Sequence, residues 1–187
     1  GDNRDKYVLT PAIKSALGLE MYEFLGVLMG VAIRTGVYLN IDLAPSIWKA
    51  LVGIPLKPND LRAIDESFYG TLEFFKMCSE AEWEEIYDWS CTLSDQSVVE
   101  LKPGSRSKIV RYTQRVEWVS LALDARLRES DLQLRYISRG LHKVVPKAMF
   151  RLWTAQDLEL RVCGSSFIDV AMLKRHTVYS AISAGSN

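Results

Sequence analysis

Few side chains in this sequence are suited to covalent chemistry. Its 187 residues include the cysteines Cys78, Cys91 and Cys163 and the histidines His142 and His176. A thiol with a nearby imidazole can act as nucleophile and base, so Cys163 with either histidine is a candidate pair for a hydrolase. Zinc needs four clustered ligands, and the sequence has no Cys-x-x-Cys or His-x-x-x-His spacing. We therefore predict no metal site and no cofactor, and one weak candidate for a nucleophile.

The surroundings of Cys163 favour a structural role over a catalytic one. The run "AQDLELRV" is typical of a helix that Gly164 ends, which places Cys163 in the last turn. The negative end of a helix dipole disfavours the thiolate, which is the reactive form of the side chain. We expect Cys163 to be buried beside Leu160 and Val162, with a raised pKa, and keep the hydrolase as a less favoured alternative.

Composition and charge exclude several classes of partner. Twenty-three basic and 23 acidic residues give a formal net charge of zero, which does not indicate a nucleic-acid or membrane partner. An odd number of dispersed cysteines indicates reduced thiols, and we expect a cytoplasmic or nuclear location. The most apolar run, Phe24 to Ile33, is shorter than the ~20 residues of a membrane-spanning helix. Its Gly26-x-x-x-Gly30 spacing instead predicts a helix that lets the backbone of a neighbouring segment approach closely.

The hydrophobic periodicity predicts a mainly α fold with a small β ribbon. Capping residues and glycine stops predict helices over Glu20–Thr35, Pro45 to Gly53, the stretch after Pro58, the stretch after Asp65, "EAEWEEIYDW" after Ser79-x-x-Glu82, the stretch after Thr113, Asp131–Lys143, the stretch after Thr154-x-x-Asp157, and "VAMLKRH" after Asp169. Periodicity changes only around Lys102-Pro103-Gly104-Ser105, which suits a type II turn. We expect Val98–Leu101 and Ile109–Tyr112 to pair across it.

Aromatic residues gather around this ribbon. Trp83, Tyr87 and Trp89 precede it and Trp118 follows it. In the helix after Thr113 we assign Val116, Ser120, Leu123 and Leu127 to the core, which leaves Trp118 on another face. Tryptophan is enriched at binding hot spots, although most tryptophans belong to the core. Both interpretations of the aromatic group stay open from composition alone.

The ordered segments resemble a known family. "FLGVLMGVAI", "VELKPGSRSKIV", "GLHKVVP" and "LELRVCGSSFIDVAMLKRHTVY" follow one another as in the amino-terminal lobe of HECT-type ubiquitin ligases. The family has F-x-G-x-x-x-G-x-A-I, L-K-x-x-G, V-V-P and E-L-E-x-x-x-C-G-x-x-x-I-D-x-x-x-L-K-x-x-T-x-Y in this order. Each motif is weak alone, but the series covers most of the chain. "MGVAIRTG" and "LAPSIW" look most like the large HERC-like branch.

The resemblance implies a ligase segment without its own nucleophile. Cys163 falls on the family's structural Cys-Gly pair, whereas the cysteine that takes ubiquitin as a thioester belongs to a separate carboxy-terminal lobe. Residues 1–179 then correspond to part of the amino-terminal lobe and 180–187 to the start of a linker, so that this piece alone is expected to be inactive. Its implied partners are a ubiquitin-conjugating enzyme, ubiquitin, and a protein substrate bound through regions outside this chain.

The resemblance also implies a docking site. The family binds the conjugating enzyme through an apolar groove in a small subdomain, here about residues 71–118, which accepts an aromatic side chain from that enzyme. The candidate groove residues are Leu72, Phe75, Trp83, Tyr87, Trp89 and Trp118. The stretch between Leu93 and Val98 is shorter than in most relatives. A helical interaction module or degenerate ligase segment that binds no conjugating enzyme is the alternative, and these aromatics would then only attach the ribbon to the helices.

Overall fold

The computed structural model describes residues 3, 5–83, 87–165 and 170–178. Its helices are α1 (Ala16–Thr35), α2 (Pro45–Leu51), α3 (Pro58–Ile64), α4 (Glu66–Met77), α5 (Arg115–Leu127), α6 (Asp131–Val144), α7 (Ala155–Cys163) and α8 (Val170–His176), with 3-10 turns at Glu80–Glu82, Tyr112–Gln114 and Lys147–Leu152. The strands β1 (Ser90–Thr92) and β2 (Val98–Glu100) form an antiparallel pair. The predicted fold class, mainly α with a small β ribbon, is confirmed. The predicted cap Asp169 and the linker 180–187 lie outside the described residues.

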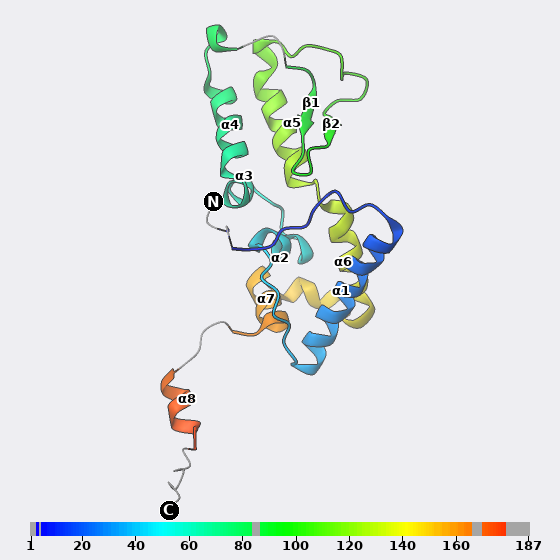
Figure 1. Ribbon diagram of the computed structural model, residues 1–187, viewed down its shortest axis with the longest axis vertical. Coiled ribbons are helices and arrows are strands. Elements are labelled where there is room, and N and C mark those ends of the chain that lie inside the picture. Colours follow the sequence, from blue (N-terminus) through cyan, green and yellow to red (C-terminus); the bar gives the residue numbers. More distant parts are fainter. Residues whose placement is uncertain (1–2, 4, 84–86, 166–169, 179–187) are drawn as a thin grey trace, which may run out of the picture.

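Two groups of elements have separate cores (Figure 1). Helices α1, α2, α6 and α7 enclose one core with Trp48, Met29 and Leu141 at its centre, and we call them the helical body. Helices α3, α4 and α5 with β1 and β2 enclose the other, which lies between residues 58 and 127. We call this second group the ribbon unit.

Glycines let α1 and α6 cross at very short range. A Cβ on Gly140 would lie 1.8 Å from the carbonyl oxygen of Glu23, and a Cβ on Gly26 would lie 2.0 Å from that of Ile137. A Cβ on Gly30 would lie 2.6 Å from the Cβ of Val144. The close approach predicted from Gly26-x-x-x-Gly30 is therefore confirmed, and the neighbouring segment is α6.

Helix α1 is longer than its apolar run suggested. The side chain of Ser15 accepts a hydrogen bond from the Gly18 amide, and this cap starts the helix at Ala16 rather than Glu20. The resulting 20 residues are long and apolar enough to cross a membrane, by length and composition alone. The sequence argument from a ten-residue run is therefore wrong, although core helices of soluble proteins also meet this criterion.

The ribbon forms with a different partner from the one predicted. Val98–Glu100 pairs with Ser90–Thr92, in the register Ser90 to Glu100 and Thr92 to Val98. The turn at Lys102-Pro103-Gly104-Ser105 exists, with the Ser105 amide bonded to the Lys102 carbonyl and Gly104 at a φ of 71°. It does not join paired strands, because the following segment instead forms an isolated bridge between Ile109 and Asp88.

Among the described residues of the helix predicted to begin at Ser79, one turn is helical. Ser79 and Glu82 form the expected capping box, Glu80–Glu82 is a 3-10 turn, and the backbone at Trp83 is extended. The Trp83 side chain is buried, and its indole Nε1 donates to the Val110 carbonyl at 3.1 Å. Burial of this tryptophan against a segment 27 residues away overrides the local helical signal.

The core face of α5 also differs from the predicted one. Trp118, Val119, Ala122 and Arg126 are its buried residues, whereas Val116 is half exposed. The predicted stripe is wrong at its start, because Val116 and Ser120 are exposed. With Arg126 included, residues 118, 122 and 126 follow the spacing of one helical face.

Candidate functional site

The predicted aromatic residues come together from four segments of the ribbon unit. The ring centroid of Phe75, on α4, lies 5.7 Å from Trp83, 4.9 Å from Tyr87 and 5.7 Å from Trp118 of α5. These pairs meet edge to face, an arrangement that aromatic rings prefer. Sequence spacing therefore identified a true spatial cluster.

Polar contacts of the indoles hold the cluster in place. Trp118 Nε1 donates to the Asp88 carbonyl at 2.9 Å, which ties α5 to the segment before β1. The Nζ of Lys102 lies 3.6 Å from the ring centroid of Trp89. Trp89 itself is buried. The contact between Trp118 and Asp88 attaches the ribbon to α5. Such attachment is the role that these aromatic residues have in the alternative without a docking groove.

Most of the candidate groove residues are core residues. Leu72 is 2% exposed and Trp118 8%, and Trp83 and Trp89 are also buried. Phe75 and Tyr87 are half-buried. Of the six candidate residues, Phe75 and Tyr87 therefore offer more surface to a partner than the other four.

A hollow of about 340 Å³ opens beside this cluster. Its apolar wall is formed by the rings of Phe68, Tyr87 and Trp118. Its polar side is formed by residues of β1 and the segment before it, Asp88, Ser90, Cys91 and Thr92. An aromatic wall with a polar rim is the usual composition of a site for a protein side chain.

Sequence analysis missed Phe68 as a wall residue and two exposed apolar residues near the end of α4. Phe74 and Met77 are both exposed, and the ring of Phe74 lies 5.8 Å from that of Phe75. Two consecutive phenylalanines on a helix cannot both face its core, so the pair "FF" was the available signal.

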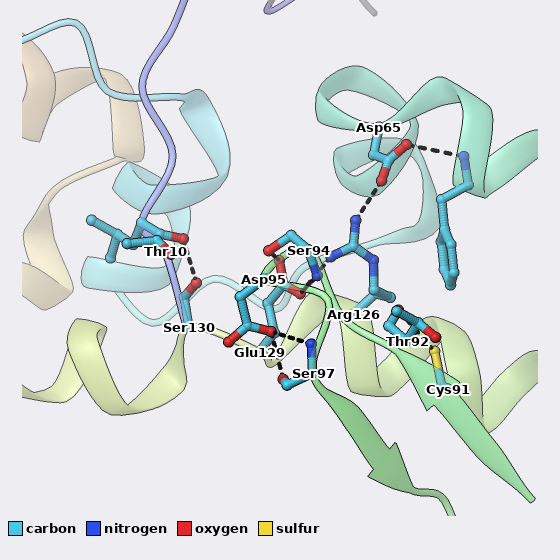
Figure 2. Close-up of polar contacts among 12 residues, drawn as sticks. Thr10, Asp65, Cys91, Thr92, Ser94, Asp95, Ser97, Arg126, Glu129 and Ser130 are labelled. Atoms are coloured by element: carbon cyan, nitrogen blue, oxygen red, sulfur yellow. Dashed lines mark hydrogen bonds and ion pairs between the residues drawn. The ribbon is translucent and has the colours of Figure 1, made fainter. Parts of the chain in front are cut away.

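A buried guanidinium fixes the position of the ribbon relative to α4 and α5. Arg126 forms ion pairs with Asp65, the cap of α4, and with Glu129 just after α5 (Figure 2). Glu129 in turn accepts hydrogen bonds from the amide and hydroxyl of Ser94, at 3.0 and 2.8 Å, in the turn that joins β1 to β2. Arg126 also lies over the ring of Phe68, so the same side chain supports the wall of the hollow.

The three cysteines lack the surroundings of a nucleophile. Burial raises the pKa of Cys91 to about 11. Burial is also the main cause that raises the pKa of Cys163, whose Sγ donates to the Ile41 carbonyl at 3.4 Å. Cys78 is buried and donates to the carbonyl of Phe75. The raised pKa values of Cys91 and Cys163 favour the protonated thiol over the thiolate.

The predicted neighbours of Cys163 are only partly correct. Val162 is buried, but Leu160 is exposed and Cys163 itself is of intermediate exposure. The helix ends at Gly164 as predicted. Among the residues that the structure describes, no group of three His, Cys, Asp or Glu side chains could hold a metal ion.

Comparisons with known proteins identify the family. The family model described as HECT-domain (ubiquitin-transferase) matches residues 2–187. The human E3 ubiquitin-protein ligase HERC2 is 37% identical over 184 residues, which cover 97% of this chain and 4% of HERC2. The human probable E3 ubiquitin-protein ligase HECTD4 is 31% identical over 95% of this chain and 5% of its own length. The human E3 ubiquitin-protein ligase HACE1 is 26% identical over 87% of this chain and 18% of its own length. The chain thus spans a small part of these relatives, and it belongs to the HECT-domain family of ubiquitin transferases.

Proposed function

We propose that this chain is the part of a HECT-type ubiquitin ligase that docks a ubiquitin-conjugating enzyme and positions it for thioester transfer. The ribbon unit is the proposed docking part, and residues 1–179 correspond to a portion of the amino-terminal lobe. The observation that carries the proposal is the hollow between Phe68, Tyr87 and Trp118, in a chain of this family.

The hollow suits an inserted aromatic or aliphatic side chain. Its wall already consists of rings, and edge-to-face packing against Tyr87 and Trp118 would add to the burial of apolar area. The polar rim at Asp88 and Ser90 offers backbone and hydroxyl groups to the edge of a partner loop. Arg126 and the indole of Trp118 keep this wall rigid before binding, which lowers the entropy lost on association.

The proposed transfer needs an acceptor thiolate, and the raised pKa values of Cys91 and Cys163 disfavour one at these two positions. In transthiolation an acceptor thiolate attacks the thioester carbonyl, and the cysteine thiolate of the conjugating enzyme leaves. Because Cys78 is buried and the raised pKa values of Cys91 and Cys163 favour protonated thiols, the proposed acceptor is a cysteine of the carboxy-terminal lobe of the ligase. The contribution of this chain is then positional, since it holds the donor thioester within reach of that cysteine.

The docking proposal is tested with a variant that changes the hollow and keeps the core. Tyr87 is half-buried, so Tyr87→Ala removes a wall of the hollow at less structural cost than replacement of the buried Trp118. Loss of one anchor residue costs about 2 kcal/mol of binding, or roughly a 30-fold weaker affinity for a conjugating enzyme. Val116→Ala, at a half-exposed position of α5 outside the hollow, is the matched control and is expected to bind like the parent.

Titration calorimetry against several ubiquitin-conjugating enzymes measures these affinities, with far-UV circular dichroism as the check on folding. If Tyr87→Ala is folded and binds as tightly as the parent, the hollow is not the docking site. If the parent chain binds none of them, it is the interaction module or degenerate segment described as the alternative. A thiol-reducible ubiquitin adduct on Cys78, Cys91 or Cys163 would contradict the assignment of the acceptor.

A further inference from the structure

A series of polar contacts connects the two sides of the hollow. The aromatic side includes Phe68, in the first turn of α4, and part of the polar side is β1. Between them, hydrogen bonds and ion pairs join the start of α4, the end of α5 and the turn after β1 (Figure 2). We call the four residues of this series the Arg126 network: Asp65, Arg126, Glu129 and Ser94.

The network is fixed to the aromatic side of the hollow by Asp65. One oxygen of its carboxylate accepts a hydrogen bond from the Phe68 amide at 3.0 Å, and the other oxygen is paired with Nη2 of Arg126. The guanidinium also lies 4.8 Å from the centroid of the Phe68 ring. Phe68 is therefore held through its backbone by Asp65 and through its ring by Arg126.

The network is fixed to the polar side of the hollow by Glu129. One oxygen of its carboxylate accepts the Ser94 hydroxyl at 2.8 Å. The other accepts the Ser94 amide at 3.0 Å and is paired with Nη1 of Arg126. Ser94 follows Thr92, the last residue of β1 and a lining residue of the hollow, by two positions. The end of β1 is thus tied to Glu129 by two hydrogen bonds.

The central residues of the network are shielded from water. The side chains of Arg126 and Glu129 are 5% and 12% exposed. Hydrogen bonds between charged groups are stronger than neutral ones, and the planar guanidinium fixes the direction in which each carboxylate is bound. A single buried arginine therefore sets both the distance and the angle between the start of α4 and the turn after β1.

A thiol of the hollow lies within the field of the network. Burial is the main cause that raises the pKa of Cys91, while the charge of Arg126 lowers this pKa and the charge of Glu129 raises it. Cys91 is 5% exposed and belongs to β1. Because labelling of a buried thiol requires the surrounding segment to move, Cys91 can report a change in the position of β1 when no partner is bound.

We propose that Ser94, Arg126 and Glu129 are positioning residues for docking, which hold β1 at a fixed distance from Phe68. The inference rests on the proposed docking function. None of the three lines the hollow, so they act through Phe68 and β1 rather than by contact with a partner. A preorganised site loses less entropy on binding, so loss of the network weakens docking although every residue of the hollow is still present.

Ser94→Ala tests the end of the network at an exposed position. The substitution removes the hydroxyl that Glu129 accepts. Ser97→Ala is the matched control, because Ser97 lies in the same turn and its hydroxyl bonds to Asp95 instead. Ser94→Thr keeps a hydroxyl at position 94 and should behave like the parent.

Glu129→Gln tests the centre of the network. It removes the charge that pairs with Arg126 and keeps the size of the side chain. Its control is Asp124→Asn, which removes a carboxylate of α5 that pairs with the exposed Arg128. Urea unfolding of all variants identifies any that have lost overall stability.

Iodoacetamide labelling of the folded chain, measured at each cysteine by mass spectrometry, shows the state of the network without a partner. Cys78 is the internal reference, since it is buried in the same unit at the opposite end of α4 from Asp65. The ratio of the Cys91 rate to the Cys78 rate should rise about fivefold in Ser94→Ala and about tenfold in Glu129→Gln. It should not change in the controls. Global unfolding exposes both thiols together and gives no selective rise at Cys91.

Titration calorimetry with a conjugating enzyme that binds the parent measures the effect on docking. Ser94→Ala should bind about fivefold and Glu129→Gln about tenfold more weakly, and the controls and Ser94→Thr should bind like the parent. An unchanged labelling ratio in both test variants, or an equal rise in Ser97→Ala, overturns the proposal, as does a raised ratio with unchanged affinity. A parent that binds no conjugating enzyme contradicts the docking function, and the labelling ratio then still decides whether the network positions β1.

Discussion

The crossing of α1 and α6 predicts opposite effects for two glycine-to-alanine substitutions. Gly140→Ala adds a methyl group 1.8 Å from the Glu23 carbonyl oxygen and 3.0 Å from the Val27 amide nitrogen. Gly70→Ala adds the same group to α4, where no atom lies within 4 Å. Both positions are inside helices and neither has a positive φ, so the difference between the variants isolates the contact.

The magnitude follows from what has to move. Alanine is favoured over glycine in a helix by about 0.8–1 kcal/mol, and both variants gain this amount. At Gly140 the obstacle is main chain, which cannot rotate away, so α1 has to shift by more than about 1 Å from α6. Overpacking of this kind costs about 1–3 kcal/mol or more, and the shift also loosens the packing of Met29 and Leu141. We expect a net loss of about 2 kcal/mol for Gly140→Ala and a gain of about 0.8 kcal/mol for Gly70→Ala.

Thermal and urea unfolding followed by circular dichroism measure both effects. For a chain of this length 1 kcal/mol corresponds to about 2–4 °C, so the Tm should fall by about 4–8 °C for Gly140→Ala and rise by about 2–3 °C for Gly70→Ala. A Gly140→Ala protein as stable as the parent would refute the close crossing. If both variants lose stability alike, the effect is not due to the crossing.

Three more predictions concern charged and ionisable groups. Arg126→Leu leaves acidic partners at a buried site and should destabilise the protein by about 3 kcal/mol in urea unfolding, whereas the exposed Arg128→Leu should change it by less than ~0.5 kcal/mol. Hydrogen bonds and ion pairs from Arg139 and Lys143 lower the pKa of Glu23, so its contribution is present at neutral pH and is lost as the pH falls below about 4. Glu23→Gln should therefore unfold at lower urea concentration than the parent at pH 7 and at a similar one at low pH. Iodoacetamide should label Cys91 and Cys163 more slowly than free cysteine at pH 8, because their raised pKa values leave little thiolate; labelling of either as fast as free cysteine would be the contrary result.

Local signals predicted the helices well. Gly36 and Gly164 end α1 and α7, and Thr154 with Asp157 caps α7. Gly26-x-x-x-Gly30 even predicted a close neighbour, because a row of glycines on an apolar helix has few other uses. These features depend on residues a few positions apart, which the sequence displays directly.

The errors arose where distant residues decide the structure. The indole of Trp83 donates a hydrogen bond to the Val110 carbonyl, and the backbone at Trp83 is extended rather than helical. Strand β2 pairs with β1, and Ile109 forms an isolated bridge with Asp88. Arg126 is buried with two acidic partners, Glu129 three residues away and Asp65 61 residues away. The sequence does not show which distant acidic residue will pair with an arginine, so a helix face that contains one resembles a solvent-exposed face. The predicted core face of α5 therefore left out Trp118.

The α1–α6 crossing also sets an order for folding during synthesis. Every element of the ribbon unit lies between residues 58 and 127, so the unit can assemble as soon as those residues have left the ribosome. Helix α1 is made earlier, yet its partner α6 begins only at Asp131. The inward face of α1, with Gly26, Met29 and Gly30, therefore waits for more than 90 residues to be translated before it can be covered. Until α6 has been made, the glycines and Met29 on this face of α1 lack the partner that buries them.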